Sequence, residues 1–229
     1  MRAGVAPGGL ISPVLFCLYV NDMASPSHHV DLAIYADETA IIATSRKPTL
    51  LVSYLDLYPN DLQRWLSELR IAINVSQSTV IIFVRAGRRF IQPRPVTLFG
   101  KPIEWVDTTR YLGATLDKGL TWSPHIDKVR KKTAQRMGTL GPLLNRKRDL
   151  SVRNGVLIFK QLIRPMTDYA LSAWRSAARS HIRRLQVLQS KCLRLATGAS
   201  WYVRNRQLHE VLGVPLFAGH IRTLTASFD

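Results

Sequence analysis

The sequence predicts an α+β fold, with short strands in its first half and helices in its second half. In residues 32–42, L-A-I-Y-A-D-E-T-A-I-I, two apolar runs flank a short acidic segment, as expected for two buried strands joined in a hairpin. Charge divides the chain near Asp117: residues 1–117 hold 11 basic and 10 acidic side chains, whereas residues 118–229 hold 21 and 5. We therefore predict two domains, a nearly neutral one over 1–117 and a basic, all-helical one over 118–229.

Length and composition indicate a globular protein. A chain of 229 residues, 46% of them hydrophobic, can bury a core as one large or two small domains. No apolar run approaches the roughly 18 residues of a membrane span, and the N-terminus lacks a signal-peptide pattern. We expect a soluble, intracellular protein of the cytoplasm or nucleus, without a membrane partner. The net charge of +17 favours a polyanionic partner, although a merely soluble cationic surface is the alternative.

Cysteines and histidines give no sign of a metal centre. Cys17 and Cys192 both lie in apolar helical patterns, so we expect two buried thiols instead of a disulfide or a metal pair. The six histidines show no Cys/His ligand spacing, so a zinc site is not expected.

The first half should begin with a buried helix over 13–23, with Ser12 as its N-cap and Pro13 in its first turn. The hairpin follows. Helical periodicity then covers 49–58, Pro59 interrupts it, and Asp61 can start a second helix to Arg70, with Leu62, Trp65, Leu66 and Leu69 on its inner face. The remaining segments are a turn at 74–79, a buried strand at 80–84, a surface loop at 87–95, and short strands at 96–99, around Trp105 and at 111–116.

The second half reads as helices. Ser123 and Pro124 start a helix that Gly141 and Pro142 should stop; its inward side chains are Ile126, Val129, Thr133, Met137 and Leu140. Further helices are expected at 150–163, ended by Pro165, and at 166–177. A strongly amphipathic helix covers 181–196 and ends at Gly198, and a short helix covers 206–212.

Basic side chains form a stripe on two of these helices. On the 181–196 helix, Arg183, Arg184, Lys191 and Arg194 lie within about a third of a turn, opposite the apolar side. On the earlier helix the basic side chains Lys128, Arg130, Lys131, Lys132 and Arg136 are left outside. Charge stripes are often only solvated faces. Charges of one sign repel each other, however, and suit a nucleic-acid phosphate backbone.

The acidic segment of the hairpin, Asp37 and Glu38, has two interpretations. Adjacent carboxylates repel each other and are desolvated by apolar neighbours, and a divalent cation such as Mg²⁺ would relieve both costs. A solvated acidic turn is the alternative, because acidic residues are common in turns.

Four motifs in order resemble the reverse transcriptases of non-LTR, LINE-type (jockey/BS-like) retrotransposons. Tyr35-Ala36-Asp37-Glu38 resembles their Tyr-Ala-Asp-Asp box, and residues 4–22 resemble the segment that precedes it. Trp65 and residues 71–74 resemble the next palm segment. Residues 111–126, with Tyr111-Leu112-Gly113 at their start, resemble the block that leads into the thumb.

This resemblance implies an RNA-directed DNA polymerase fragment, with a partial palm over 1–117 and a helical thumb and connection over 118–229. Its chemistry would be nucleotidyl transfer with two Mg²⁺ ions, held in part by Asp37 and Glu38. Tyr35, Ala36, Pro7 and Gly8 would shape the nucleotide and template pocket. The implied partners are an RNA template and a DNA primer, and also an intact polymerase or an element RNA–protein particle.

Several positions depart from the family pattern. Pro7 lacks the amide side chain found there, and Gln77 stands where the family usually has Lys. Glu38 is one methylene longer than Asp, which displaces its carboxylate by about 1.5 Å where catalytic sites tolerate about 0.5 Å. The family also has an aspartate upstream of the Gly4 motif, which would precede Met1. We therefore expect a fragment that is inactive unaided. The alternatives are a non-catalytic, basic nucleic-acid-binding remnant and a decayed reading frame whose product barely folds.

Overall fold

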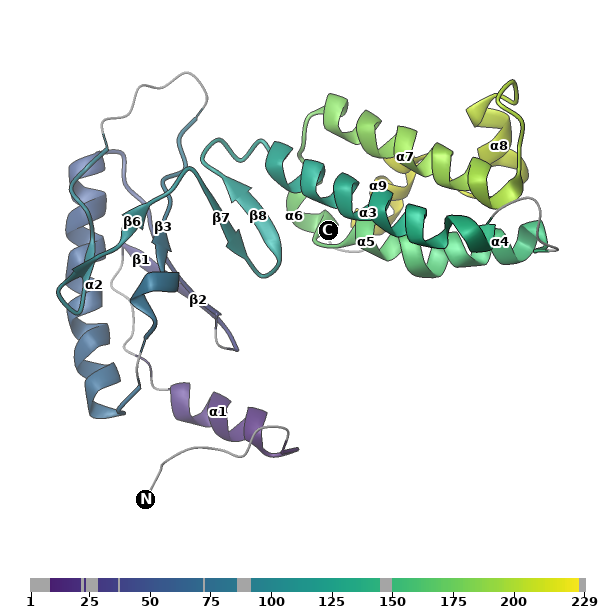
Figure 1. Cartoon of the computed structure of the whole chain (residues 1–229). Coiled ribbons are helices and arrows are strands. Elements are labelled where there is room, and N and C mark those ends of the chain that lie inside the picture. The colour runs from purple at the N-terminus through teal and green to yellow at the C-terminus, as the bar shows by residue number, and fades with distance from the viewer. Residues whose placement is uncertain are drawn as a thin grey trace. The chain divides into compact units, whose positions relative to one another are not determined.

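The structure is a computed structural model of the whole chain, and it describes residues 9–21, 23, 29–36, 38–71, 73–85, 92–144 and 150–226. The chain forms two compact units, Met1–Leu112 and Gly113–Asp229. Figure 1 shows helices and short strands in the first unit and mostly helices in the second. This confirms the predicted mixture of helix and strand.

The hairpin predicted around residues 32–42 is present. β1 (Val30–Tyr35) pairs antiparallel with β2 (Glu38–Ala43), so that Val30 lies opposite Ala43 and Tyr35 opposite Glu38. The strands are only partly buried, however, and the prediction of two buried strands is wrong. The reason is that side chains alternate between the two faces. One face, with Leu32 and Ile41, packs on the core, whereas Ile42 on the other face is exposed.

A single helix, α2 (Pro48–Glu68), covers the inner face of the hairpin. The predicted break at Pro59 is wrong, because the helix runs through that position. Proline removes one backbone donor, but Tyr58, Leu62 and Leu66 continue one buried stripe across it. Burial of that stripe against Val30 holds the two halves of the helix together. The predicted inner face at Leu62 and Leu66 is confirmed.

The first helix forms but is not buried. α1 (Ser12–Val20) has no buried residue, and Cys17 is exposed, so both predictions of burial are wrong. Apolar side chains surround the whole helix, and one neighbouring element can cover only part of such a surface. Ile11 is the N-cap and Ser12 is the first helical residue, which corrects the predicted cap. The Tyr19 hydroxyl donates to the Leu69 carbonyl at 2.6 Å.

The rest of the first unit consists of short elements. The predicted turn at 74–79 contains the short 3₁₀ helix η1 (Val75–Gln77), and the predicted strand at 80–84 is reduced to β3 (Thr79–Val80), which pairs in parallel with β6 (Glu104–Trp105). β4 (Thr97–Leu98) and β5 (Lys101–Pro102) form a second hairpin. Its turn, Phe99-Gly100, has positive φ at both residues, 50° and 70°, as tight hairpins require. β7 (Thr108–Tyr111) follows. Of the predicted loop at 87–95, residues 87–91 lie outside the described part.

In its described residues, the second unit is helical apart from β8 (Ala114–Asp117) and connecting loops. Its helices are α3 (Ser123–Leu144), α4 (Val152–Ile158), the π-helical turn η2 (Phe159–Ile163), α5 (Arg164–Asp168), α6 (Leu171–Trp174), α7 (Arg179–Thr197), α8 (Asn205–Val211) and α9 (Phe217–Thr225). The α3, α7 and α8 segments confirm predicted helices, and Gly198 caps α7 with a left-handed φ of 64°. The sequence pattern did not predict α9.

Gly141, Pro142 and Pro165 do not end helices, although we expected them to. α3 continues through Gly141 and Pro142, because Leu140 and Leu144 bury the same side of its last turn. Pro165 lies in the first turn of α5 instead of ending a helix, a position where proline loses no hydrogen bond. The predicted helix at 166–177 is split, since Ala170 adopts a left-handed φ of 55° between α5 and α6.

Two apolar clusters make the core of the second unit, and α7 contributes to both. Leu185 packs in a cluster with Trp174 and Phe217, and Cys192 packs in the other cluster with Phe159. Cys192 is buried, as predicted, and this burial raises the pKa of its thiol to about 12.

The loop into α3 is held by a buried carboxylate. Asp117 Oδ2 accepts from the backbone N–H and the hydroxyl of Thr121 at 3.0 and 2.9 Å, and Oδ1 accepts from the Trp122 N–H at 2.8 Å. Burial pushes the pKa of Asp117 up, but these hydrogen bonds outweigh it and lower the pKa below its ordinary value. One turn later, buried His125 accepts from the Thr115 N–H through Nδ1 at 3.2 Å.

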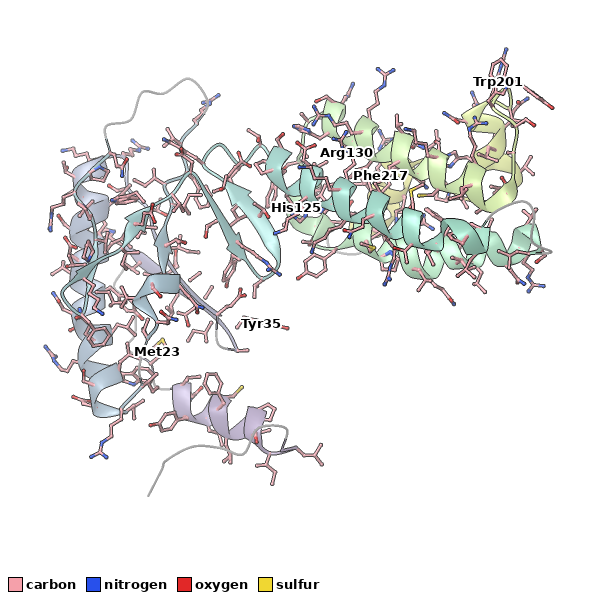
Figure 2. The ribbon with its side chains drawn as sticks, viewed as in Figure 1. Met23, Tyr35, His125, Arg130, Trp201 and Phe217 are labelled. Atoms are coloured by element: carbon pink, nitrogen blue, oxygen red, sulfur yellow. The ribbon has the colours of Figure 1, made fainter. Side chains whose placement is uncertain are left out.

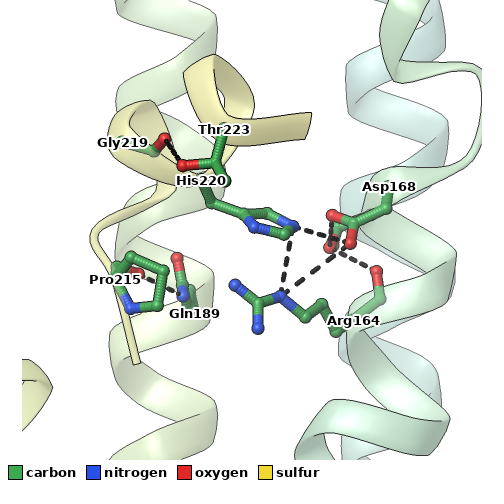
Figure 3. A network of polar contacts seen from close by, with 8 residues as sticks. Arg164, Asp168, Gln189, Pro215, Gly219, His220 and Thr223 are labelled. Carbon is green, nitrogen blue, oxygen red and sulfur yellow. Dashed lines mark hydrogen bonds and ion pairs between the residues drawn. The ribbon is translucent and has the colours of Figure 1, made fainter. Parts of the chain in front are cut away.

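A polar network ties α9 to α5 (Figure 3). His220 Nε2 lies 2.8 Å from Asp168 Oδ2 and 3.2 Å from Arg164 Nε. Nearby, the Gln189 amide donates to the Pro215 carbonyl at 3.1 Å. Within the described ranges, none of the helices combines the length and the hydrophobicity that a membrane span needs.

Candidate functional site

The hairpin turn carries the first group of predicted site residues. Tyr35 ends β1 with 66% of its surface exposed, and Ala36 follows with a left-handed φ of 50°. Glu38 begins β2 directly opposite Tyr35. The turn therefore presents an aromatic ring and a carboxylate at one end of the hairpin. Asp37, Pro7 and Gly8 lie outside the described residues.

The Glu38 carboxylate already has a partner in the first unit. Its Oε2 accepts from the backbone N–H of Leu112 at 2.6 Å, a short distance typical of a charge-assisted hydrogen bond. Leu112 itself has a left-handed φ of 45°. Two segments that were singled out separately in the sequence, the acidic turn and Tyr111-Leu112-Gly113, are thus joined by one hydrogen bond.

A divalent cation needs more ligands than the described residues supply here. Across the described ranges, no three His, Cys, Asp or Glu side chains gather in a way that could hold a metal ion. Glu38 offers one carboxylate, and one of its oxygens is engaged by Leu112. The described part alone therefore does not make a complete Mg²⁺ site.

Basic side chains on α3 form the second group. Lys128, Lys132 and Arg136 follow each other at i,i+4 spacing, which places them along one side of the helix. Lys131 and Arg136 are exposed, and Lys128 is half-buried. The apolar side of α3 confirms the predicted inner face, with Ile126, Val129 and Thr133 buried and Met137 half-buried.

Some of the basic side chains on α7 already form contacts with other residues of the second unit. Arg184 donates to Asp127 Oδ1 on α3 at 3.3 Å, and Arg130 lies 3.7 Å from the same oxygen. One carboxylate thus bridges the two helices inside the basic surface. Reasoning from the sequence missed Asp127, although its i,i+3 spacing to Arg130 was a readable signal.

Arg194 has a different environment from the other basic residues of α7. Its guanidinium donates to the carbonyls of Ser200 and Val203 and to Asn205 Oδ1, the first and last at 2.6 and 2.7 Å. Arg183 and Lys191 are exposed by contrast. The structure therefore places Arg183, Arg184 and Lys191 on the solvent side of α7 and uses Arg194 to hold the following loop.

Comparison with known proteins agrees with the motifs of the first unit. The profile of the family described as reverse transcriptase (RNA-dependent DNA polymerase) matches residues 2–116, which include the hairpin turn. The chain belongs to this reverse transcriptase family. No solved structure matches the chain.

Curated relatives confirm the predicted resemblance to retrotransposon reverse transcriptases. The chain is 33% identical to a probable RNA-directed DNA polymerase from transposon X-element of Drosophila melanogaster, over 93% of this chain and 24% of the relative. It is 30% identical to the RNA-directed DNA polymerase from mobile element jockey and 31% identical to the probable one from transposon BS, both of the same species. Those two matches cover 100% of this chain and 25% and 26% of the relatives. The chain thus spans about a quarter of their length.

Proposed function

We propose that this chain supplies two parts of an RNA-directed DNA polymerase: the hairpin turn of the nucleotidyl-transfer site, and a basic helical unit that holds the RNA template and DNA primer. The observation that carries the proposal is the β1–β2 hairpin itself, with Tyr35 before the turn, Ala36 in it and Glu38 after it, in a segment that matches the reverse transcriptase family. In this proposal the first unit is part of the palm, and the second is the thumb and connection.

Within the proposed site, Asp37 and Glu38 supply the carboxylates, and Tyr35 and Ala36 border the nucleotide pocket together with Pro7 and Gly8. Reverse transcriptases generally use a divalent metal, and Mg²⁺ would stabilise the charge on the attacking and leaving oxygens. Binding of that ion by this chain depends on Asp37, since Glu38 is hydrogen-bonded to Leu112.

Nucleic acid would bind the second unit through its phosphates. The exposed cations Lys131, Lys132, Arg136, Arg183 and Lys191 belong to two helices that pack on each other in one unit, and few acidic side chains oppose them. Such a surface neutralises phosphates and releases their counterions without reading base sequence.

A chimera tests the catalytic part of the proposal. The chain aligns over its full length with a quarter of the jockey polymerase, so it can replace that quarter in the jockey protein. We expect the chimera to extend a DNA primer on an RNA template, to lose extension with Asp37→Asn, and to extend faster with Glu38→Asp. Equal extension by the Asp37→Asn chimera would show that the turn is not part of the site.

A second candidate function is a non-catalytic nucleic-acid-binding remnant. The observation that favours it is the use of the Glu38 carboxylate as a structural acceptor for Leu112. This candidate predicts a chimera that binds template and primer as tightly as the parent polymerase but gives no extension, even with Glu38→Asp. The pair of measurements, binding and extension on the same chimera, distinguishes the two candidates.

A further inference from the structure

The loop between α7 and α8 exposes two neighbouring aromatic rings. Trp201 has 87% of its surface exposed and Tyr202 has 71%. Their ring centroids lie 6.1 Å apart with the planes at 80° to each other. Figure 2 shows Trp201 on this loop, beside α8. The contrast within the same unit is clear, because Trp122 and Trp174 are both buried. Large aromatic side chains are costly to leave in water, so an exposed pair indicates a binding surface.

The loop is firmly anchored on both sides of the pair. Ala199 and Val203, which flank the two rings, pack against the apolar cluster below. Arg194 of α7 reaches the loop from underneath and donates to the Ser200 and Val203 carbonyls and to Asn205. The two aromatic rings therefore extend into solvent from a held backbone. A rigid presentation lowers the entropy lost when a ligand stacks on them.

The surroundings of the pair favour an anionic ligand with flat rings. Residues 199–206, A-S-W-Y-V-R-N-R, contain two arginines and no acidic side chain. Arg204 and Arg206 are both exposed, and Arg206 is paired with Glu210 at 2.9 Å on the outside of α8. Aromatic rings next to cations are the combination by which proteins bind single strands, since bases stack on the rings while phosphates meet the charges.

We propose that Trp201 and Tyr202 form a stacking platform for unpaired bases of single-stranded nucleic acid, displayed by the Arg194-held loop. The inference rests on the proposed nucleic-acid-binding function of the second unit and adds a place where single strands are distinguished from duplex. Bases in a duplex are already stacked and cannot reach the rings, whereas its phosphates can still reach α3 and α7.

Binding of a fluorescently labelled 12-nucleotide RNA of mixed sequence to the full chain tests the proposal, alongside a blunt duplex of the same sequence. Replacing both rings, Trp201→Ala with Tyr202→Ala, should weaken single-strand binding roughly 5- to 100-fold and leave duplex binding within about twofold. The salt dependence of the remaining binding should not change, because no cation is removed.

Three further variants separate stacking from other effects. Trp201→Phe with Tyr202→Phe keeps two aromatic faces and should retain most of the affinity for single strands. Val211→Ala removes another exposed apolar side chain of the same unit and should have no effect. Arg194→Gln keeps the rings but releases the loop, and we expect weaker single-strand binding here as well.

Each outcome decides one question. The stacking platform is wrong if the double alanine variant binds single strands like the wild type, or if it loses duplex binding equally. An equal loss of single-strand binding with Val211→Ala would show that the loss is not specific to the two rings, and it would likewise overturn the stacking platform. If the wild-type chain binds neither RNA form, the proposed nucleic-acid-binding function fails together with this inference, and the two kinds of failure are thus distinguishable.

Discussion

The two units of this chain differ in how their cores support their surfaces. Among the described residues, the largest fully buried side chains, such as Trp174, Phe217 and Ile126, all belong to the second unit. The first unit has a smaller core, made where α2 covers one face of the hairpin, and its α1 has no buried residue. The acidic turn thus sits on a hairpin supported by one helix, whereas the basic surface sits on a densely packed bundle.

This comparison separates two kinds of functional residue. The basic side chains of α3 and α7 project from helices whose opposite sides are fixed by buried apolar contacts, so single changes to them should leave the fold intact. The turn residues are part of the support itself, because Glu38 holds the Leu112 backbone. Changes at the turn should therefore affect structure and chemistry together.

The largest expected difference between the units comes from one matched pair of core leucines. Leu185 in the second unit is 1% exposed and Leu62 in the first is 2% exposed. We expect Leu185→Ala to lower the free energy of unfolding of its unit by about 3–5 kcal/mol, and Leu62→Ala by about 2–3 kcal/mol, because the one-sided hairpin core can collapse onto the cavity. Native-state hydrogen exchange measures each unit separately. Equal costs would contradict a difference in packing.

A pair of helical glycines tests the packing within the second unit. A Cβ at Gly155 would lie 2.4 Å from the Ala196 carbonyl oxygen, whereas a Cβ at Gly138 meets nothing within 4 Å. We expect Gly155→Ala to destabilise the unit by about 1–3 kcal/mol, since α4 must move away from α7. Gly138→Ala should stabilise it by up to about 1 kcal/mol. Urea denaturation followed by circular dichroism measures both, and a neutral Gly155→Ala would show that the two helices are not in close contact.

The second unit should lose stability as the pH falls through the histidine range. Burial and then the nearby charge of Lys128 lower the pKa of His125 below its ordinary value. Because the unfolded chain then binds a proton more readily than the folded one, stability is full above about pH 6.5 and decreases at lower pH, by at most about 1.4 kcal/mol per pH unit.

Comparison with His125→Asn isolates this effect. The asparagine can still accept from the Thr115 N–H but does not titrate. Unfolding by urea at pH 7 and at pH 5 should show a smaller pH dependence in the variant. An identical dependence in both proteins would mean that His125 is not the titrating group. The lowered pKa of Asp117 adds a further loss of stability only in strong acid, below about pH 4.

The smallest expected effect concerns the turn of the first unit. Glu38→Asp shortens the side chain by about 1.5 Å, so its carboxylate can no longer reach the Leu112 N–H. Amide exchange at Leu112 should become faster by an amount equivalent to about 0.5–1.5 kcal/mol. Glu38→Gln keeps an acceptor at the original length and serves as the control. Unchanged protection at Leu112 in Glu38→Asp would exclude the hydrogen bond as a support of the turn.

Sequence patterns predicted the features that depend on local periodicity. The hairpin at 32–42 follows from two apolar runs on either side of an acidic segment, and the helices α3 and α7 follow from apolar residues at helical spacing. The stops assigned to Pro59 and Pro142 were wrong, since buried side chains on both sides of each proline outweigh one lost hydrogen bond. The stop assigned to Pro165 was wrong because this proline lies in the first turn of α5, where it costs no hydrogen bond. The prediction that α1 is buried was also wrong. The hydrophobicity of a helix shows that its side chains favour burial, but it does not show whether a neighbouring element is there to cover them.

The candidate sites were only partly predictable from the sequence, because their contacts depend on how separate segments of the chain come together. A helical wheel places Arg194 beside Lys191 and Arg184, but it cannot show that the chain folds back after Gly198 and brings three acceptors to that one guanidinium. Likewise, the link between Glu38 and Leu112 joins positions far apart in the sequence. The exposed pair of Trp201 and Tyr202 lies in a loop without periodicity, where no pattern distinguishes a buried ring from an exposed one.

The salt dependence of nucleic-acid binding tests most directly whether the well-packed second unit binds phosphates through its basic surface. Filter binding of a mixed-sequence duplex between about 50 and 200 mM salt should give a log–log slope of roughly −4 to −5, as expected for about 4–6 phosphate contacts. Arg184→Gln with Lys191→Gln should reduce the slope by about 2 and weaken all sequences alike, with thermal unfolding lowered only slightly through the loss of the half-exposed Arg184–Asp127 ion pair. A flat salt dependence, or a slope that the double variant does not alter, would contradict phosphate binding by this surface.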